Sequence, residues 1–299
     1  MELHQLKYFQ SVARSGSITK AAELEQVSQP SVSIAIKKLE GELGVKLLDR
    51  TGKKCALTAE GRIFFQKVNS LLVCLQDAVA EVQDYHLSHK GSIKVGITPI
   101  MGMLLFPHAF ADFQKQNPEV NVTIAEEGSL LICKQLKQGD IDLGIMITND
   151  LPSSFNIFPI ISGPLHVCLP HDDPLCKTAN ISLRDLRNHS FILFKEDTYT
   201  RKLILEECAK LQFSPRIVFS SNQIGTVLNL VEQGMGISFF FEEIVRDHRE
   251  IFSSPLAEQL TLQFGLVWNR KRYLSKTARL FIESVQKTFS SQNKSSAGV

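Results

Sequence analysis

The sequence predicts a multidomain protein, with an all-α N-terminal domain, a long linker helix and a C-terminal α/β domain of two Rossmann-like lobes. Apolar residues recur at helical spacing with little interruption up to Tyr85. From Ile93 onward, strand-like and helix-like segments alternate, which is typical of a mostly parallel sheet. The 299 residues, 43% of them hydrophobic, suffice for two or three domains with cores of their own.

Three short helices are expected in the N-terminal domain. An amphipathic segment begins at Leu3, Ser17 can cap a second helix, and Ser28 can cap a third. Pro30 suits the first turn of the third helix, where a missing N–H costs little. This helix gathers its apolar residues on one face, at Val32, Ile36, Leu39 and Leu43. Its other face carries hydroxyl, amide and amine groups, which can contact base edges and phosphates.

A small hairpin is expected after the third helix. Residues 47–50 and 55–58 would form its strands around a basic tip, which can lie along a phosphate backbone or in the minor groove. Helix pair and hairpin together predict a winged helix-turn-helix over residues 1–58. The residues expected to contact DNA are Ser28, Gln29, Pro30, Ser31, Ser33, Ile34, Lys37, Arg50, Lys53 and Lys54. The alternative is a helix pair without a DNA role, whose lysines are simply solvated.

These residues closely resemble the LysR-type transcriptional regulators. The matching positions are Phe9, Val12, Gly16, Ser17, Ala21, Ala22, Val27, Ser28, Gln29, Pro30, Ser33, Ile36, Leu39, Glu40, Leu43, Gly44, Leu47, Arg50, Thr51, Leu57, Thr58 and Gly61. The resemblance implies a sequence-specific, DNA-binding transcriptional regulator. The chain departs from the family at three places. Glu25 stands where Leu is usual, Ile34 where a basic or polar residue is usual, and Leu48 where Phe is usual. At Ile34, contact with a thymine methyl could replace a phosphate contact.

Charge and periodicity both favour a dimer. Residues 1–67 hold 11 Lys+Arg and 7 Asp+Glu, a net +4, whereas residues 68–299 hold 22 and 24, a net −2. This basic excess is modest, so paired domains are favoured for DNA binding. A linker helix is expected over residues 59–88, with a coiled-coil seam at Phe64, Val68, Leu71, Leu75, Ala78 and Val82. The alternative is a helix packed on its own domain. The resemblance implies that this helix pairs two chains, and a homotetramer is expected.

Two α/β lobes are expected in the remainder. The first would comprise residues 92–161 and 265–290, and the second residues 162–264. A Pro/Gly-rich turn is expected after the first strand, Ile93–Ile97, and the last ten residues are expected to be disordered. A strand at Leu262–Trp268 would cross back to the first lobe. The resemblance implies an effector domain similar to periplasmic solute-binding proteins.

A small-molecule effector is expected in the cleft between the lobes. Loops at the carboxyl ends of the strands, where helix N-termini offer free N–H groups, should line it. The expected contacts are Thr98, Pro99, Ile100, Met101, Gly128, Ser129, Thr148, Phe194, Lys195 and Asn222. A hydroxyl residue is common in the family where Ile100 stands, which favours a ligand with an apolar part. The alternative is that these residues only form turns and cap helices.

Other classes of function have weaker support. The sequence lacks the serine-hydrolase, Walker and zinc-protease motifs, so no enzyme and no cofactor are expected. Cys168 and Cys176, with His166 and His171 nearby, leave open a redox- or metal-responsive DNA-binding regulator. No metal site is expected, because no CxxC pair is present. No signal peptide or membrane span is expected, so the protein should be cytoplasmic. Double-stranded promoter DNA and the effector are the expected partners, with RNA polymerase as a further one.

Overall fold

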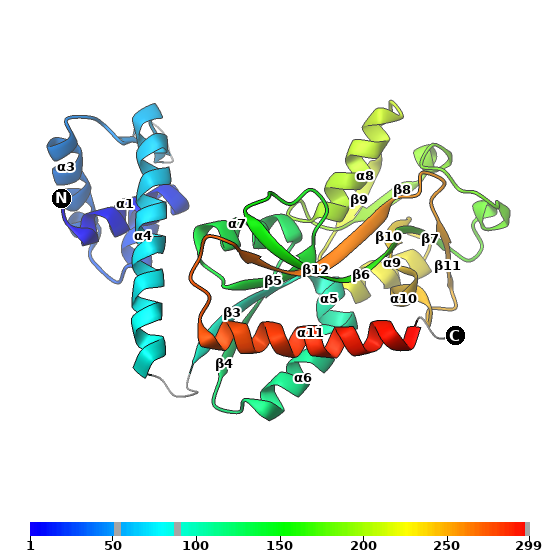
Figure 1. Cartoon of the computed structure of the whole chain (residues 1–299). Helices are drawn as coiled ribbons and strands as arrows, with labels where there is room; N and C mark the ends of the chain where they lie inside the picture. Colours follow the sequence, from blue (N-terminus) through cyan, green and yellow to red (C-terminus); the bar gives the residue numbers. More distant parts are fainter. Residues whose placement is uncertain (51–54, 87–90, 297–299) are drawn as a thin grey trace. The chain divides into compact units, whose positions relative to one another are not determined.

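The computed structural model describes residues 1–50, 55–86 and 91–296 of the chain. The chain divides into two compact units, Met1–Val82 and Gln83–Val299. Each unit is described by itself below, with the element labels of Figure 1.

The first unit is a three-helix core with a small hairpin. Its elements are α1 (Leu3–Ser15), α2 (Ile18–Leu24), α3 (Gln29–Leu43), β1 (Leu48–Asp49), β2 (Ala56–Leu57) and α4 (Ala59–His86). The hairpin pairs β1 with β2 in antiparallel register. Phe9, Ile36 and Leu39 are fully buried between the helices, as the apolar spacing predicts. Ser17 and Ser28 cap α2 and α3 through their side-chain oxygens, so the expected helix starts are confirmed.

Two contacts attach the hairpin to the helices. The buried carboxylate of Glu40, on α3, accepts hydrogen bonds from the backbone N–H groups of Leu47 (2.9 Å) and Leu48 (3.2 Å). At Gly61 on α4, a Cβ atom would lie 2.0 Å from the carbonyl oxygen of Leu47. Only glycine therefore permits this approach between the hairpin and the long helix.

The long helix α4 divides into a buried and an exposed apolar part. Val68 and Leu72 are buried in the core of the first unit, and Phe64 is half-buried against it. The expected seam was therefore wrong at its first two positions, because these side chains already have intramolecular partners. Further along, the expected seam residues Leu71 (50% exposed), Leu75 (40%), Ala78 and Val82 (61%) are exposed, and Val79 (48%) lies beside them.

The second unit contains two sheets. The first has the order β4-β3-β5-β12-β6. Its strands are β3 (Ser92–Ile97), β4 (Asn121–Glu126), β5 (Leu143–Ile147), β6 (Phe155–Pro164) and β12 (Thr261–Asn269). β3 pairs in parallel with β4 and β5, whereas β12 runs antiparallel to β5 and β6. The helices of this lobe are α5 (Pro99–Leu104), α6 (Phe106–Gln116), α7 (Ser129–Gln138) and α11 (Lys276–Ser296).

The second sheet has two pieces, β8-β9 and β10-β7-β11. Its strands are β7 (His166–Pro170), β8 (Ser190–Leu193), β9 (Arg216–Ser220), β10 (Ser238–Phe240) and β11 (Ile251–Pro255). A single parallel bridge between Phe191 and Ile237 joins the pieces. The helical segments are η1 (Pro174–Lys177), η2 (Asp185–Asn188), α8 (Tyr199–Lys210), α9 (Ile224–Glu232) and α10 (Glu242–Val245). The fold is thus the expected combination of a helical N-terminal unit and a two-lobed α/β unit (Figure 1).

Three local expectations were wrong. The segment after β3 is the helix α5 rather than a turn, because Pro99 occupies its first turn and Ile100 and Met101 are buried. β6 and β11 have no counterpart among the expected strands. The C-terminal helix continues to Ser296, so most of the supposedly disordered tail is helical. β6 and β12 pair as far as Pro164 and Thr261, so the two lobes are connected through long strands rather than short loops.

Candidate DNA-binding surface and ligand cleft

The N-terminal turn of α3 exposes a polar surface. Ser28 caps the helix, and its Oγ accepts the Ser31 N–H at 3.3 Å and lies 2.7 Å from the Ser31 hydroxyl. Gln29 and Pro30 are exposed beside them. Such a helix end presents backbone N–H groups and short polar side chains, which suits approach to a phosphate and to base edges.

The exposed stripe of α3 continues in the same direction. Ser33 is half-buried and Lys37 is exposed. Ile34 is 65% exposed, which is unusual for so large an apolar side chain in a small domain. An exposed isoleucine between a hydroxyl and an amine can contact the methyl group of a thymine in the major groove.

The hairpin supplies one described cation to this surface. Arg50 is exposed and its guanidinium lies 3.8 Å from the buried Glu40 carboxylate, which also has Lys46 at 3.5 Å. Glu40 thus contacts both the hairpin backbone and the two basic side chains at the start of the hairpin. Lys53 and Lys54, which the sequence also assigned to DNA, lie outside the described residues.

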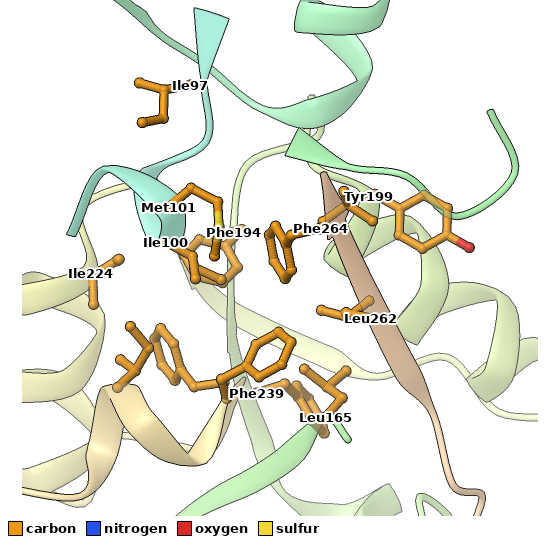
Figure 2. Packing of buried hydrophobic residues seen from close by; sticks show 14 of the residues in the cluster. Ile97, Ile100, Met101, Leu165, Phe194, Tyr199, Ile224, Phe239, Leu262 and Phe264 are labelled. Atoms are coloured by element: carbon orange, nitrogen blue, oxygen red, sulfur yellow. The ribbon is translucent and has the colours of Figure 1, made fainter. Parts of the chain in front are cut away.

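A pocket lies between the two sheets of the second unit. Its lining residues are Thr98, Pro99, Ile100, Gly128, Ser129, Ile147, Phe194, Thr198, Thr200 and Phe264. Six of the expected effector contacts are among them: Thr98, Pro99, Ile100, Gly128, Ser129 and Phe194. Figure 2 shows Ile100 of α5, Phe194 just after β8 and Phe264 of β12 within one apolar cluster.

Four expected contacts do not line this pocket. Met101 is fully buried in the apolar core beneath it. Thr148 lines a separate groove and donates a hydrogen bond to the Gln263 carbonyl at 3.2 Å. Lys195 lines a third depression, and its N–H donates to the Asn222 side chain at 3.0 Å. Being at the carboxyl end of a strand was therefore not enough to place a side chain in the pocket.

Sequence reasoning missed four lining residues: Ile147, Thr198, Thr200 and Phe264. One of them had a usable signal. Thr198 immediately precedes α8, at the position where threonine is a favoured cap. Ile147 and Phe264 are paired strand residues, and nothing in their local sequence indicates which face the cleft would use.

The pocket is small and uncharged. Its volume is about 20 Å³, enough for roughly one water molecule. None of its ten lining residues carries a charge. Ser129 Oγ accepts the Ile147 N–H at 3.3 Å, and Thr198 Oγ1 donates to the Lys195 carbonyl at 2.8 Å. Thr98 Oγ1 is buried without a hydrogen-bond partner among the described residues.

Hydrogen bonds cross between the lobes beside the pocket. Asp197 Oδ2 accepts the Gly128 N–H at 2.8 Å, and the Asp197 main-chain oxygen accepts the Leu130 N–H at 3.0 Å. Tyr199 Oη donates to Asp150 at 2.9 Å. Burial, followed by this hydrogen bond and the Asp150 charge, raises the pKa of Tyr199 to about 12. The phenol therefore remains a donor throughout the neutral range.

Neither Cys168 nor Cys176 has the lowered pKa of an activated thiol. Burial raises the pKa of Cys168 to about 12 and, less strongly, the pKa of Cys176, and Cys176 Sγ contacts the Pro170 carbonyl oxygen at 3.4 Å. A raised pKa disfavours the reactive thiolate. Within the described part of the chain, no group of three or more His, Cys, Asp or Glu residues is placed to hold a metal ion. Likewise, no described helix is long and apolar enough to cross a membrane.

Comparisons with known proteins agree on the two units. Residues 3–62 match the model for bacterial regulatory helix-turn-helix proteins of the lysR family, and residues 87–290 match that for the LysR substrate binding domain. The uncharacterised HTH-type transcriptional regulator YwbI of Bacillus subtilis is 30% identical over 301 residues, covering 100% of both chains. The dual regulator GltC of the same organism is 27% identical, covering 97% of this chain and 98% of its own. The solved structure of HinK, a LysR family regulator from Pseudomonas aeruginosa, is 28% identical with a TM-score of 0.55, covering 96% and 98%.

Proposed function

Because the chain belongs to the LysR family of DNA-binding transcriptional regulators, with a helix-turn-helix and an effector-binding domain, we propose specific roles for its residues. The N-terminal end and outer stripe of α3 contact promoter DNA, and the pocket between the two sheets binds the small-molecule effector. The observation that supports this most directly is the stripe of the exposed Ile34 and Lys37 and the half-buried Ser33, opposite the buried face of α3.

Two adjacent lysines offer a matched test of the DNA contacts. Lys37 lies on the proposed stripe, whereas Lys38 is rotated about 100° around the helix and pairs with Glu2 at 3.4 Å. Each alanine substitution removes one positive charge, so general attraction to DNA falls equally. The probe is a duplex that the full chain selects from a random library, and binding is read by fluorescence anisotropy. We expect Lys37→Ala to weaken binding about tenfold and Lys38→Ala about twofold. Equal losses of duplex affinity in the two variants would contradict the proposal that this face of α3 contacts DNA.

The exposed part of α4 supports a homodimer. Leu71, Leu75, Val79 and Val82 form an apolar stripe that no described part of the chain covers, and coiled-coil pairing with a second copy would bury it. A dimer also supplies the second basic domain that the modest charge of one domain favours. We further propose a homotetramer, in which two such dimers hold four recognition helices along the DNA and RNA polymerase is a further partner. The protein would act in the cytoplasm and without catalysis of its own.

The effector would act by shifting a population of lobe arrangements. The pocket holds about 20 Å³, so an effector larger than a water molecule has to widen the space between the lobes on entry. Widening would break the Tyr199–Asp150 hydrogen bond, which joins the lobes beside the pocket. An effector that binds the widened arrangement more tightly therefore shifts the equilibrium toward it, in proportion to that difference in affinity. We propose lobe limits at residues 92–161 with 265–290, and 162–264.

A further inference from the structure

The end of α7 that faces the cleft is already occupied by an anion of the chain itself. The Asp197 carboxylate accepts the Gly128 N–H, and its main-chain oxygen accepts the Leu130 N–H. The Asn222 amide donates to the same carboxylate at 3.2 Å, and so holds it from the other side. The free N–H groups of a helix N-terminus attract anions. Here that attraction is satisfied by Asp197, which comes from the opposite lobe.

Gly128 makes this approach feasible. A Cβ atom at this position would lie 2.3 Å from the Asp197 main-chain oxygen and 2.7 Å from its carboxylate carbon. Any side chain here would push Asp197 away from the helix end. The close contact is therefore specified by the residue types on both lobes.

No cation of the pocket is available to compensate a second anion. The nearest basic residues along the chain, Lys195 and Arg201, line a separate depression together with Asp197. Arg201 is already engaged, because its guanidinium donates to the Phe194 carbonyl at 3.0 Å and to Ser220 at 2.8 Å. A carboxylate or phosphate in the pocket would thus lie near the Asp197 charge, and no lining residue of the pocket carries a compensating charge.

The pocket instead offers neutral polar groups and apolar walls. Thr98 Oγ1, on a residue that is 5% exposed, has no hydrogen-bond partner among the described residues and lines the pocket. A hydroxyl can donate one hydrogen bond and accept others, and leaving it unpaired in a buried site is unfavourable. Phe194, Phe264 and Ile100 supply the apolar walls.

We infer that the cleft selects a compact uncharged effector, with an apolar body and an amide or alcohol group that pairs with Thr98, and that Asp197 is the residue that excludes carboxylates and phosphates. The inference rests on the proposed effector site and specifies its ligand class.

Matched acid and amide probes test this on the full chain. The probes are benzamide and isobutyramide, with benzoate and isobutyrate as their anionic counterparts at pH 7.5. Thermal unfolding of the effector domain is followed at increasing probe concentration, because a ligand that binds only the folded protein raises its Tm. We expect the two amides to raise the Tm of the wild-type protein and the two carboxylates to leave it unchanged.

Two substitutions locate the selectivity. Asp197→Asn keeps an oxygen that can accept the Gly128 N–H but removes the charge, so the carboxylates should now bind at least about tenfold more tightly than to wild type. Asp197→Ser, which keeps the main-chain contact to Leu130, serves if the first variant is unstable. Thr98→Val, nearly identical in shape, should weaken amide binding about tenfold by removing the unpaired hydroxyl.

Three outcomes would overturn the inference. Carboxylates that stabilise the wild-type protein as much as the amides do would remove the exclusion by Asp197, as would an Asp197→Asn variant with unchanged preference. If none of the four probes raises the Tm at concentrations up to 20 mM, the proposed ligand class of the pocket is wrong. Duplex binding is measured on the same samples with and without probe. Amides that bind without altering duplex binding would contradict the proposed effector role while leaving the ligand class intact.

Discussion

Replacing Glu40 should loosen the hairpin from the recognition helix without unfolding the chain. Its carboxylate accepts two backbone N–H groups, at 2.9 and 3.2 Å. Hydrogen bonds to a charged acceptor contribute about 1.5–3 kcal/mol each. The ion pairs with the more exposed Lys46 and Arg50 add at most about 1 kcal/mol. Water reaching the freed N–H groups offsets part of this sum. We therefore expect Glu40→Ala to destabilise the attached hairpin by about 3 kcal/mol, and Glu40→Gln by about half as much.

Hydrogen exchange measures this local change directly. With exchange followed by mass spectrometry on the full chain, the amides of Leu47 and Leu48 should lose protection by roughly 100-fold in Glu40→Ala, which corresponds to about 3 kcal/mol. The control is Glu42→Ala, because Glu42 is an exposed carboxylate on the same helix and pairs with the chain's amino terminus rather than with the hairpin. If the Glu40 variants exchange no faster than the Glu42 variant, the carboxylate does not hold the hairpin.

Three further predictions concern packing, assembly and thiol chemistry. Gly61→Ala should destabilise the first unit by about 2 kcal/mol through the hairpin clash, whereas Gly41→Ala, with open space at its Cβ, should stabilise it by about 1 kcal/mol; both are read by hydrogen exchange. Leu75→Lys should break the pairing through α4 and so lower the sedimentation coefficient, and an unchanged sedimentation coefficient would contradict pairing through α4. At pH 8, iodoacetamide should modify the exposed Cys74 within minutes but leave Cys168 unmodified, because the Cys168 thiol is buried and its pKa is about 12; early loss of both thiols in mass spectra would revive a redox role.

The N-terminal unit was predictable because its signals are local. Cap residues and apolar spacing define each helix within about 15 residues, and the structure confirms both caps. The contact of Glu40 with the hairpin also spans only seven and eight residues. What local pattern could not give was the role of Phe64 and Val68, because their spacing fits a coiled-coil seam and a core equally well.

The cleft was predictable only in outline. Alternation of strand and helix places loops at the carboxyl ends of strands, which brought Thr98, Gly128 and Ser129 to the pocket. The side chains that decide its chemistry come together over long separations. The Gly128–Asp197 hydrogen bond, for example, spans 69 residues. Asp197 belongs to no sequence motif, so its contact with Gly128 follows only from how the two lobes pack.

The division of α4 has a consequence for how a dimer would fix its recognition helices. Val68 and Leu72 pack into the same core as Ile36 and Leu39 of α3, so this part of α4 and the recognition helix move as one body. The exposed side chains from Leu71 to Val82 continue the same helix without a break. A second copy that pairs with this stripe therefore orients not only α4 but also α3, through packed side chains rather than a flexible loop. The separation of two recognition helices would then depend on the register of the α4 pair, and a one-heptad shift of about 10 Å along the helix would misplace them on the DNA.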